Sequence, residues 1–460
     1  MGPREFANQI CSALIGVGYE ALLVGGCVRD LLLGREPADY DVATSATPEQ
    51  VMQLFPEGVG VGAQFGVILL PLDGMKVEVA TFRSDAGYSD GRHPDAVVYS
   101  KSAEEDVQRR DFTINGLLMR HRNGEILDYV GGRNDLQARL IRAIGEPSRR
   151  FAEDKLRMLR AVRFAARFGY EIEPETFAAI REYASQITQV SAERIREELS
   201  KLLTEGAARR GFELLDATGL LPQVLPEIAR LQGVQQPPQY HPEGDVWTHT
   251  LLMLEGLPAG TAPTLAWGVL LHDVGKPATF RSAEETGDRI RFDRHVEVGM
   301  AIGKEILHRL RFSNEDTDQV LALIENHMKF KDVRQMKQST LKRFVRLPRM
   351  QEHLALHRLD CLSSHGNLDA YEFVRDFIRS TPLEQVRPPR LLSGEDVISL
   401  GHAPGPIIGE ALAAVEEAQL NGELSTADQA LAYVKKHFKL PRKTRNSRRP
   451  GTKKTSRKGS

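Results

Sequence analysis

The sequence predicts an α+β protein with a small mixed-sheet head domain followed by a long, all-α part. Three observations favour this fold class. Apolar and β-branched runs of strand length are concentrated before about residue 142, helical spacing dominates from about residue 146, and stretches rich in Pro, Gly and Gln interrupt the helical part. A chain of 460 residues also exceeds one ordinary hydrophobic core. We therefore expect a head at 1–142, helical parts at 143–231, 240–380 and 388–440, and a disordered basic tail at 441–460.

The head elements follow from local patterns. Short apolar runs bounded by Gly, Pro or Asp indicate buried strands, and Pro48 near the start of "PEQVMQLF" is typical of a first helical turn. Asp73-Gly74 is a hairpin signal. In chain order we expect strand 21–26, a helical turn 27–34 that Gly34 ends, strand 39–44, helix 48–55, strands 65–72 and 75–82, and a polar, mobile loop at 84–95.

The helical part reads as amphipathic helices with two linkers. Helical periodicity is clear in "EDKLRMLRAVRFAARF" (153–168), "AERIREELSKLL" (192–203) and "GFELLDATGLLPQVL" (211–225). "QGVQQPPQYHPEGD" (232–245) is a break suited to a domain boundary, and "RSTPLEQVRPPRLLSGEDV" (379–397) looks like a second linker.

Composition narrows the class of protein. The chain is 41% hydrophobic and 27% charged, and no apolar run approaches the roughly 20 residues that cross a bilayer. The N-terminus lacks a secretory pattern, and the 3 cysteines lack CxxC spacing, which argues against a disulfide framework or cysteine zinc site. We expect a cytoplasmic protein with no membrane association and no obligate protein partner. The net charge of −1 argues neither for nor against binding of a nucleic acid. The basic tail either adds non-specific affinity for polyphosphate or only aids solubility.

Acidic residues in the head indicate a metal site. In a strand, Asp39 and Asp41 would share one face, and Glu78 would face the same way as Lys76, opposite Val77 and Val79. Such carboxylates stay charged together only beside a cation. Mg²⁺ suits their oxygens and brings substrate phosphates with it, which predicts phosphoryl-type chemistry. The alternative is a tight turn followed by a solvated acidic loop.

Gly25 and Gly26 precede these acids at a strand-to-helix turn. Glycine permits close backbone approach, and N–H groups at a helix start attract phosphate.

Together these residues carry a resemblance. "LLVGGCVRDLLLGREPADYDVAT" resembles the signature of the class II tRNA nucleotidyltransferase and bacterial poly(A) polymerase family, in the polymerase-β superfamily. "RRDFTINGL", "LDYVGG", "EDKLRMLRAVRF" and "SAERIREEL" resemble its later motifs, in order, so the likeness covers roughly residues 20 to 215. It implies a polymerase-β-like head with metals on Asp39 and Asp41 and Glu78 as a third acid. It also implies nucleotide contacts from Gly25, Gly26, Arg29, Arg110, Asp111 and Asn115.

Base choice can be argued from hydrogen bonding. In a helix, Asp154 and Arg157 would share a face. A carboxylate accepts from an exocyclic amine and a guanidinium donates to a ring nitrogen, so the pair suits cytosine and adenine and disfavours uracil and guanine. The resemblance adds Glu153 to this template for CTP and ATP. Arg160 and Arg163 extend a cationic stripe suited to a triphosphate or RNA backbone; the alternative is an ordinary surface ion pair.

A second set of residues indicates a helical metal site. His249, then adjacent His272 and Asp273, His295, His327 and Asp360 occur in the order of the HD phosphohydrolase superfamily, which they resemble. Imidazole and carboxylate ligands suit Ni²⁺, Co²⁺, Mn²⁺ or Mg²⁺, and a bound metal activates water on a phosphate ester. Such a domain either hydrolyses phosphate esters or only supports the fold.

The resemblance implies an enzyme that adds CCA to the acceptor end of tRNA from CTP and ATP, without a nucleic-acid template. A-only addition and poly(A) polymerisation stay open. "GVGAQFGVILL" lacks the basic run of the polymerases, and "RSDAGYSDGRHPDAVVYS" looks too long for a CC-only enzyme. Alternatives of another class are an HD phosphohydrolase with an RNA-binding head and an inactive RNA-binding protein; the intact Asp39 and Asp41 pair speaks against both.

Overall fold

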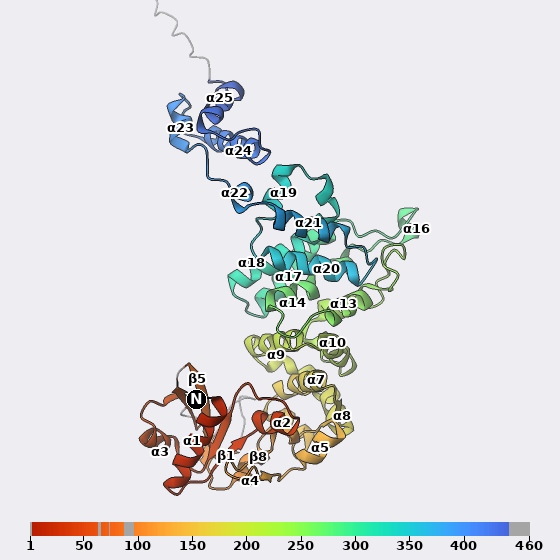
Figure 1. Cartoon of the computed structure of the whole chain (residues 1–460). Helices are drawn as coiled ribbons and strands as arrows, with labels where there is room; N and C mark the ends of the chain where they lie inside the picture. Colours follow the sequence, from red (N-terminus) through yellow and green to blue (C-terminus); the bar gives the residue numbers. More distant parts are fainter. Residues whose placement is uncertain (1, 63–65, 73, 87–95, 441–460) are drawn as a thin grey trace, which may run out of the picture. The chain divides into compact units, whose positions relative to one another are not determined.

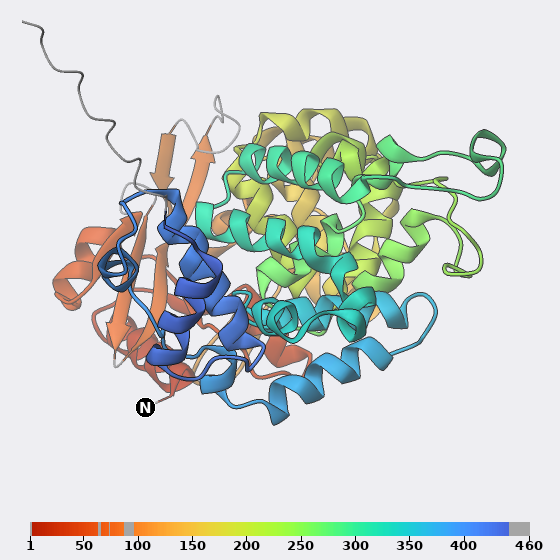
Figure 2. The same ribbon diagram turned by 90° about the horizontal axis from the view of Figure 1, so that it is seen from above.

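A computed structural model describes residues 2–62, 66–72, 74–86 and 96–440. The chain forms two compact units, one of residues 1–328 with 351–368 and the other of residues 329–350 with 369–460. Strands are gathered in the N-terminal part of the first unit and helices make up the rest (Figures 1 and 2). The predicted α+β class, a mixed-sheet head before an all-α part, is confirmed. The expected domain boundaries stay predictions.

The head is built on one mixed sheet. Within the described residues its order is β3-β4-β5-β2-β1-β8-β9, and every pair is antiparallel except β2 with β5. Two smaller sheets pair β6 with β7 and β10 with β11. The strands are β1 Ala21–Val24, β2 Asp41–Thr44, β3 Val59–Gly62, β4 Val67–Leu72, β5 Met75–Thr81, β6 Arg83–Ala86, β7 Ala96–Tyr99, β8 Leu118–Met119, β9 Ile126–Leu127, β10 Leu140–Ile141 and β11 Glu171–Ile172.

Alternation along the strands gives the main sheet two faces. Val42, Val77 and Val79 point into the larger core, together with the buried side of α1 (Pro3–Gly16). Leu22, Val24 and Ala43 point to the opposite face, towards Val107 of α4 (Ala103–Gln108). Asp41 precedes Val42 and Glu78 lies between Val77 and Val79, so both acids belong to the face of α4. This face carries the candidate chemistry.

The remaining helices lie partly in the head and mostly after it. Those of the first unit are α2 Gly26–Leu32, α3 Pro48–Leu54, α5 Gly132–Ala138, α6 Pro147–Glu153, α7 Leu156–Phe168, α8 Pro174–Tyr183, α9 Ala192–Thr204, α10 Ala208–Ala217, α11 Leu221–Val224, α12 Pro226–Ala229, α13 Val246–Glu255, α14 Pro263–Leu271, α15 Lys276–Thr279, α16 Ala283–Thr286, α17 His295–Arg309 and α18 Asn314–Asn326, with 3₁₀ turns η2 Thr113–Asn115 and η3 Ala184–Gln189. α20 (Met350–Leu362) and η4 (His327–Gln335) cross the division between the units.

The second unit has its own small core. Leu392, Val397, Val415 and Val434 are buried together there. Its helices are α19 Gln338–Phe344, α21 Asp369–Ser380, α22 Leu383–Val386, α23 Gly394–Ser399, α24 Pro406–Leu420 and α25 Ala427–His437.

Two expected elements differ from the structure. Strand 39–44 begins only at Asp41, because Asp39 and Tyr40 form an irregular segment between the bend at Ala38 and β2. The expected continuous helix 153–168 is broken: α6 ends at Glu153, Asp154 has an extended backbone with φ −147° and ψ 105°, and α7 begins at Leu156. Both corrections affect candidate site residues.

Other expectations fall partly outside the described residues. These are most of the polar loop 84–95, position 73 of the hairpin, and the basic tail 441–460. β4 and β5 do pair antiparallel, with Leu72 opposite Met75. Across the part of the chain that the structure describes, no helix combines the length and apolarity that crossing a membrane requires.

Candidate functional site

The acids of the head meet where β2 begins. Asp41 is the first residue of β2, and its register partner on the parallel strand β5 is Glu78. Asp39 lies two residues earlier and is exposed. Burial, the nearby Glu78 carboxylate and Asp39 raise the pKa of Asp41 to about 6, although Arg110 opposes the rise. A divalent cation would relieve this repulsion, so the donor set fits a hard metal such as Mg²⁺.

Gly25 lies in contact with Arg110. Its backbone has φ +74°, and a Cβ built on it would lie 3.5 Å from Nη1 of Arg110. Two bonds from Nε and Nη2 of Arg110, at 3.2 and 2.9 Å, hold this guanidinium on Oδ2 of the fully buried Asp106. The Gly25 N–H donates to the Leu117 carbonyl at 3.0 Å. Asp106 therefore holds the Arg110 guanidinium in contact with this turn, and the Gly25 N–H is occupied by the Leu117 carbonyl.

Arg29 and Asn115 form a second link across the head. Arg29, 5% exposed, donates from Nη1 to Oδ1 of Asn115 at 2.6 Å. Asn115 donates in turn to Oδ1 of Asp111 at 3.1 Å. Oδ2 of Asp111 accepts from Nε and Nη2 of Arg160 on α7, at 2.9 and 2.7 Å. Burial alone would raise the pKa of Asp111, but Arg160 and the Asn115 bond outweigh it and lower the pKa to about 2. These contacts tie α7 to the head.

The side chains of Asp154 and Arg157 do not bind each other, although the Arg157 backbone N–H donates to the Asp154 carbonyl at 3.1 Å. Oδ1 and Oδ2 of Asp154 accept from Nη1 and Nη2 of Arg194 on α9, at 3.2 and 2.8 Å. Arg157 donates from Nη1 to Oε2 of Glu153 at 2.9 Å and from Nη2 to the Arg109 carbonyl at 3.0 Å. The shared helical face expected for this pair is wrong because Asp154 lies in the break between α6 and α7.

The arginines along α7 are already paired with acids. Arg160 binds Asp111, and Arg163, 5% exposed, lies 2.6 Å from Oε2 of Glu198. Arg163 and Arg167 both lie near Oε1 of Glu205, at 3.1 and 3.4 Å. Instead of an open cationic stripe, the structure has an ion-pair network between α7 and α9.

The second constellation comes together in the helical part. His249 lies on α13, His272 caps α14, His295 begins α17, His327 follows α18 and Asp360 lies on α20. Nε2 of His272 is 3.1 Å from Oδ2 of Asp273, and Nε2 of His249 is 3.3 Å from Oδ1 of Asp360. Nε2 atoms of His295 and His327 each lie 3.8 Å from Oδ1 of Asp273. All six residues predicted as metal ligands therefore lie in one cluster.

The imidazoles are oriented for metal binding. Nδ1 of His272, His295 and His327 lies 2.7–2.9 Å from the carbonyl oxygen three residues earlier, which fixes the proton on Nδ1. Their Nε2 atoms are buried and face the Asp273 carboxylate without forming a hydrogen bond within the described residues. A cation would satisfy these lone pairs, so the residues fit a metal centre.

Sequence reasoning missed several supporting residues. Glu243 accepts from Nδ1 of His249 at 2.7 Å and of His241 at 2.9 Å, but it lies in the segment that was read only as a linker. Asp106 could have been found from its helical spacing to Arg109 and Arg110. Arg194 lies in the motif "SAERIREEL", and nothing in the sequence alone pairs it with Asp154.

Glycines bring the HD doublet against α17. A Cβ at Gly275 would lie 2.1 Å from the carbonyl oxygen of His295 and 2.6 Å from the backbone nitrogen of Gly299. The turn after Asp273 and the start of α17 therefore touch backbone to backbone.

Comparison with known proteins places this arrangement in a family. Residues 21–142 match the model described as the poly A polymerase head domain, residues 169–231 that of the probable RNA and SrmB-binding site of polymerase A, and residues 246–351 the HD domain. The CCA-adding enzyme of Leuconostoc mesenteroides is 32% identical over 439 residues, which are 95% of this chain and 97% of that relative. The chain belongs to the CCA-adding enzyme family.

Two further relatives support this membership. The CCA-adding enzyme of Geobacillus sp. (strain WCH70) is 45% identical over 218 residues, which are 47% of this chain and 54% of that protein. The crystal structure of the Bacillus stearothermophilus CCA-adding enzyme in complex with CTP superposes with a TM-score of 0.73 at 30% identity, covering 95% of this chain and 98% of that one. The head match contains the acids, and the HD match contains the four histidines and Asp273.

Proposed function

We propose that the chain adds CCA to the 3′ end of tRNA, taking CTP and ATP as substrates and using no nucleic-acid template. The observation that carries the proposal is the near-complete match to a CCA-adding enzyme, combined with the meeting of Asp41 and Glu78 across β2 and β5. The relatives reported above are CCA-adding enzymes, so A-only addition and poly(A) polymerisation are not favoured. The expected location, the cytoplasm, rests on the tRNA substrate.

Asp39, Asp41 and Glu78 would hold Mg²⁺, which when bound supplies positive charge to the triphosphate. The attacking group is the terminal hydroxyl of the tRNA and the leaving group is pyrophosphate. Arg110, 19% exposed in its side chain and fixed by Asp106, places a guanidinium beside these acids. It is therefore positioned to bind a phosphate of the incoming nucleotide.

Asp154 and Arg157 are proposed to choose the base. The Asp154 carboxylate accepts from Arg194 and from the Leu156 N–H at 3.1 Å, and a carboxylate has lone-pair capacity beyond these bonds. It can accept the amine of cytosine or adenine, while Arg157 donates to the adjacent ring nitrogen. Uracil and guanine would place a carbonyl oxygen against the Asp154 carboxylate, and the two acceptor oxygens would repel each other.

The proposed activity has a direct test. The protein and Mg²⁺ are incubated with tRNAs that end before CCA, after C and after CC, with each of the four NTPs. CCA addition predicts C incorporation on the first two substrates, A on the third, and no extension beyond A. Addition of A alone, or of long A tracts, would overturn the assignment.

We propose a second activity for the HD site, hydrolysis of phosphate monoesters or 2′,3′-cyclic phosphates. The observation that favours it is the set of buried, unpartnered Nε2 atoms around Asp273. The assay offers 2′,3′-cyclic nucleotides with Ni²⁺, Co²⁺, Mn²⁺ or Mg²⁺. His272→Gln should abolish turnover and His308→Gln, an exposed histidine on α17 outside the cluster, should not. No turnover with any ion, in protein that still adds nucleotides, would leave the site a structural role.

A further inference from the structure

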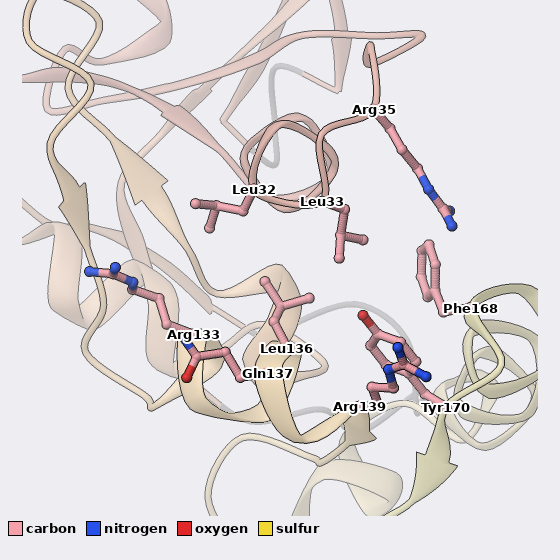
Figure 3. A pocket seen from close by; sticks show the side chains of 9 residues that line it. All are labelled: Leu32, Leu33, Arg35, Arg133, Leu136, Gln137, Arg139, Phe168 and Tyr170. Atoms are coloured by element: carbon pink, nitrogen blue, oxygen red, sulfur yellow. The ribbon is translucent and has the colours of Figure 1, made fainter.

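A pocket lies at the C-terminal end of α2, away from the acids. It has a volume of about 530 Å³ and contains no carboxylate among the residues that line it. Leu32 at the end of α2 and Leu33, which caps it, face Leu136 of α5 across its floor (Figure 3). Phe168 at the end of α7 and Tyr170, just before β11, close one side, with ring centroids 5.7 Å apart.

Three arginines stand around this apolar and aromatic surface. Arg35 and Arg139 lie towards the Phe168 and Tyr170 side, and Arg133 lies at the other end (Figure 3). All three are exposed, and within the described residues none of them forms a salt bridge. The arginines along α7, by contrast, are paired with acids. The pocket therefore presents uncompensated positive charge beside leucine side chains and the partly exposed ring of Phe168.

This combination identifies the ligand chemistry. Guanidinium groups bind phosphate oxygens, and aromatic or apolar faces accept a base. The absence of a lining carboxylate leaves no ligand for the metal that accompanies a triphosphate. A phosphodiester-linked nucleotide needs no such metal. The chemistry thus favours a nucleotide of an RNA strand over a free NTP.

The position of the pocket is consistent with a strand that ends at the acids. α2 has 7 residues, so Gly26 and Leu32 lie about 9 Å apart along its axis. Between them, Arg29 places its guanidinium 4.6 Å from the centroid of Phe168, the ring that also lines the pocket. At a spacing of about 3.4 Å along one strand, about three nucleotides cover this distance.

We propose that this pocket binds a nucleotide of the tRNA acceptor strand, upstream of the end that is extended. The inference rests on the proposed function for the identity of the RNA. Phosphate oxygens of the strand bind Arg35 and Arg139, and a base packs against Phe168 and the leucine floor. The site is separate from the one that holds the incoming CTP or ATP.

The first test removes the charge. Arg35→Gln is combined with Arg139→Asn, because Arg139 has φ +57° and asparagine tolerates this backbone. Binding of tRNA lacking CCA is measured by fluorescence anisotropy without NTP, at several salt concentrations. We expect roughly tenfold weaker binding of tRNA. The slope of the logarithm of the binding constant against the logarithm of salt concentration should be smaller in magnitude by about 1 to 2. Arg122→Gln, an exposed head arginine outside the pocket, should change neither.

The second test maps occupancy directly. All three native cysteines are buried, so Leu32→Cys, at a 41% exposed position of the pocket, introduces one reactive thiol. Saturating tRNA should slow its alkylation at least about tenfold, whereas CTP with Mg²⁺ should not. A thiol introduced as Val17→Cys, at a 55% exposed position, serves as control and should react equally in all arms.

The outcomes separate the two proposals. Protection by CTP alone, or a raised KM for CTP with unchanged tRNA binding, would assign the pocket to free nucleotide and overturn the inference. Unchanged tRNA binding in the double variant, together with unprotected Leu32→Cys, would also overturn it. Wild-type protein that binds tRNA at this pocket but adds no nucleotide would contradict the proposed function alone.

Discussion

The Asp154 side chain is bound by Arg194 from α9 and the Arg157 side chain by Glu153, so the two side chains proposed to read the base do not bind each other. Asp154 can occupy this position because its backbone is extended at the break between α6 and α7. The Asp154 carboxylate is therefore held in place by a cation from another helix.

Loss of this carboxylate should relax base choice. We expect Asp154→Ala to reduce the preference for CTP and ATP over UTP and GTP by about 10-fold to 100-fold, as expected for a contact of about 1–3 kcal/mol. The relative kcat/KM of all four NTPs on one tRNA measures it. Mg²⁺ dependence should be unchanged, since the head acids are intact. A variant that keeps the wild-type order of preference would refute the template role.

A side chain at Gly25 should strain the turn beside Arg110. Gly25→Ala carries the cost of a positive φ, of order 1–2 kcal/mol, and its Cβ would touch the Arg110 guanidinium at an ordinary contact distance of 3.5 Å. We expect lower stability and a lower kcat, because relief of the backbone strain shifts the turn that Arg110 contacts. Gly34→Ala is the matched control, because Gly34 also has positive φ, +69°, but its Cβ would meet nothing within 4 Å. Unfolding and single-turnover measurements on both variants separate strain from loss of activity; equal kcat losses would argue against this role.

The Asp111 carboxylate should make stability depend on pH at acid values. Its pKa is lowered from 3.8 to about 2 in the folded protein, so the stabilisation is complete above about pH 4 to 5 and disappears as pH falls through 2. We expect Asp111→Asn to cost roughly 2 kcal/mol at pH 7, with a smaller difference from wild type at pH 3. Urea unfolding across this range checks it. A difference that stays constant with pH would contradict the ion pair with Arg160.

Metal should stabilise the HD cluster. Ni²⁺ or Co²⁺ at saturating concentration is expected to raise Tm, because binding to the folded state alone adds roughly 3 kcal/mol at 100 times Kd. His327→Gln should remove most of this increase, since its Nε2 is one of the buried unpartnered atoms. His308→Gln should retain the full shift. An identical shift in all three proteins would indicate metal binding elsewhere.

The sequence predicted those features of the fold and the site that depend on local residue patterns and on the order of motifs along the chain. Strand periodicity predicts that Val77 and Val79 point into the core and that Glu78 points away from it. The order of His272-Asp273 and its partner residues along the chain predicts a cluster built from five separate segments. The break at Asp154 was not predicted, because "EDKLRMLRAVRF" has helical periodicity and no Gly or Pro. Local sequence also could not show that the α7 arginines meet Glu198 and Glu205, which lie 35 and 42 residues away.

The contact between Gly275 and Gly299 has a consequence for ion choice. Because backbone meets backbone there, no side chain can repack to let the loop that carries Asp273 slide along α17. The separation of Asp273 from His295 is thus set by two main chains in van der Waals contact, and the centre should tolerate only a narrow range of ionic radii. Any residue larger than glycine at 275 would widen that range by forcing the two segments apart.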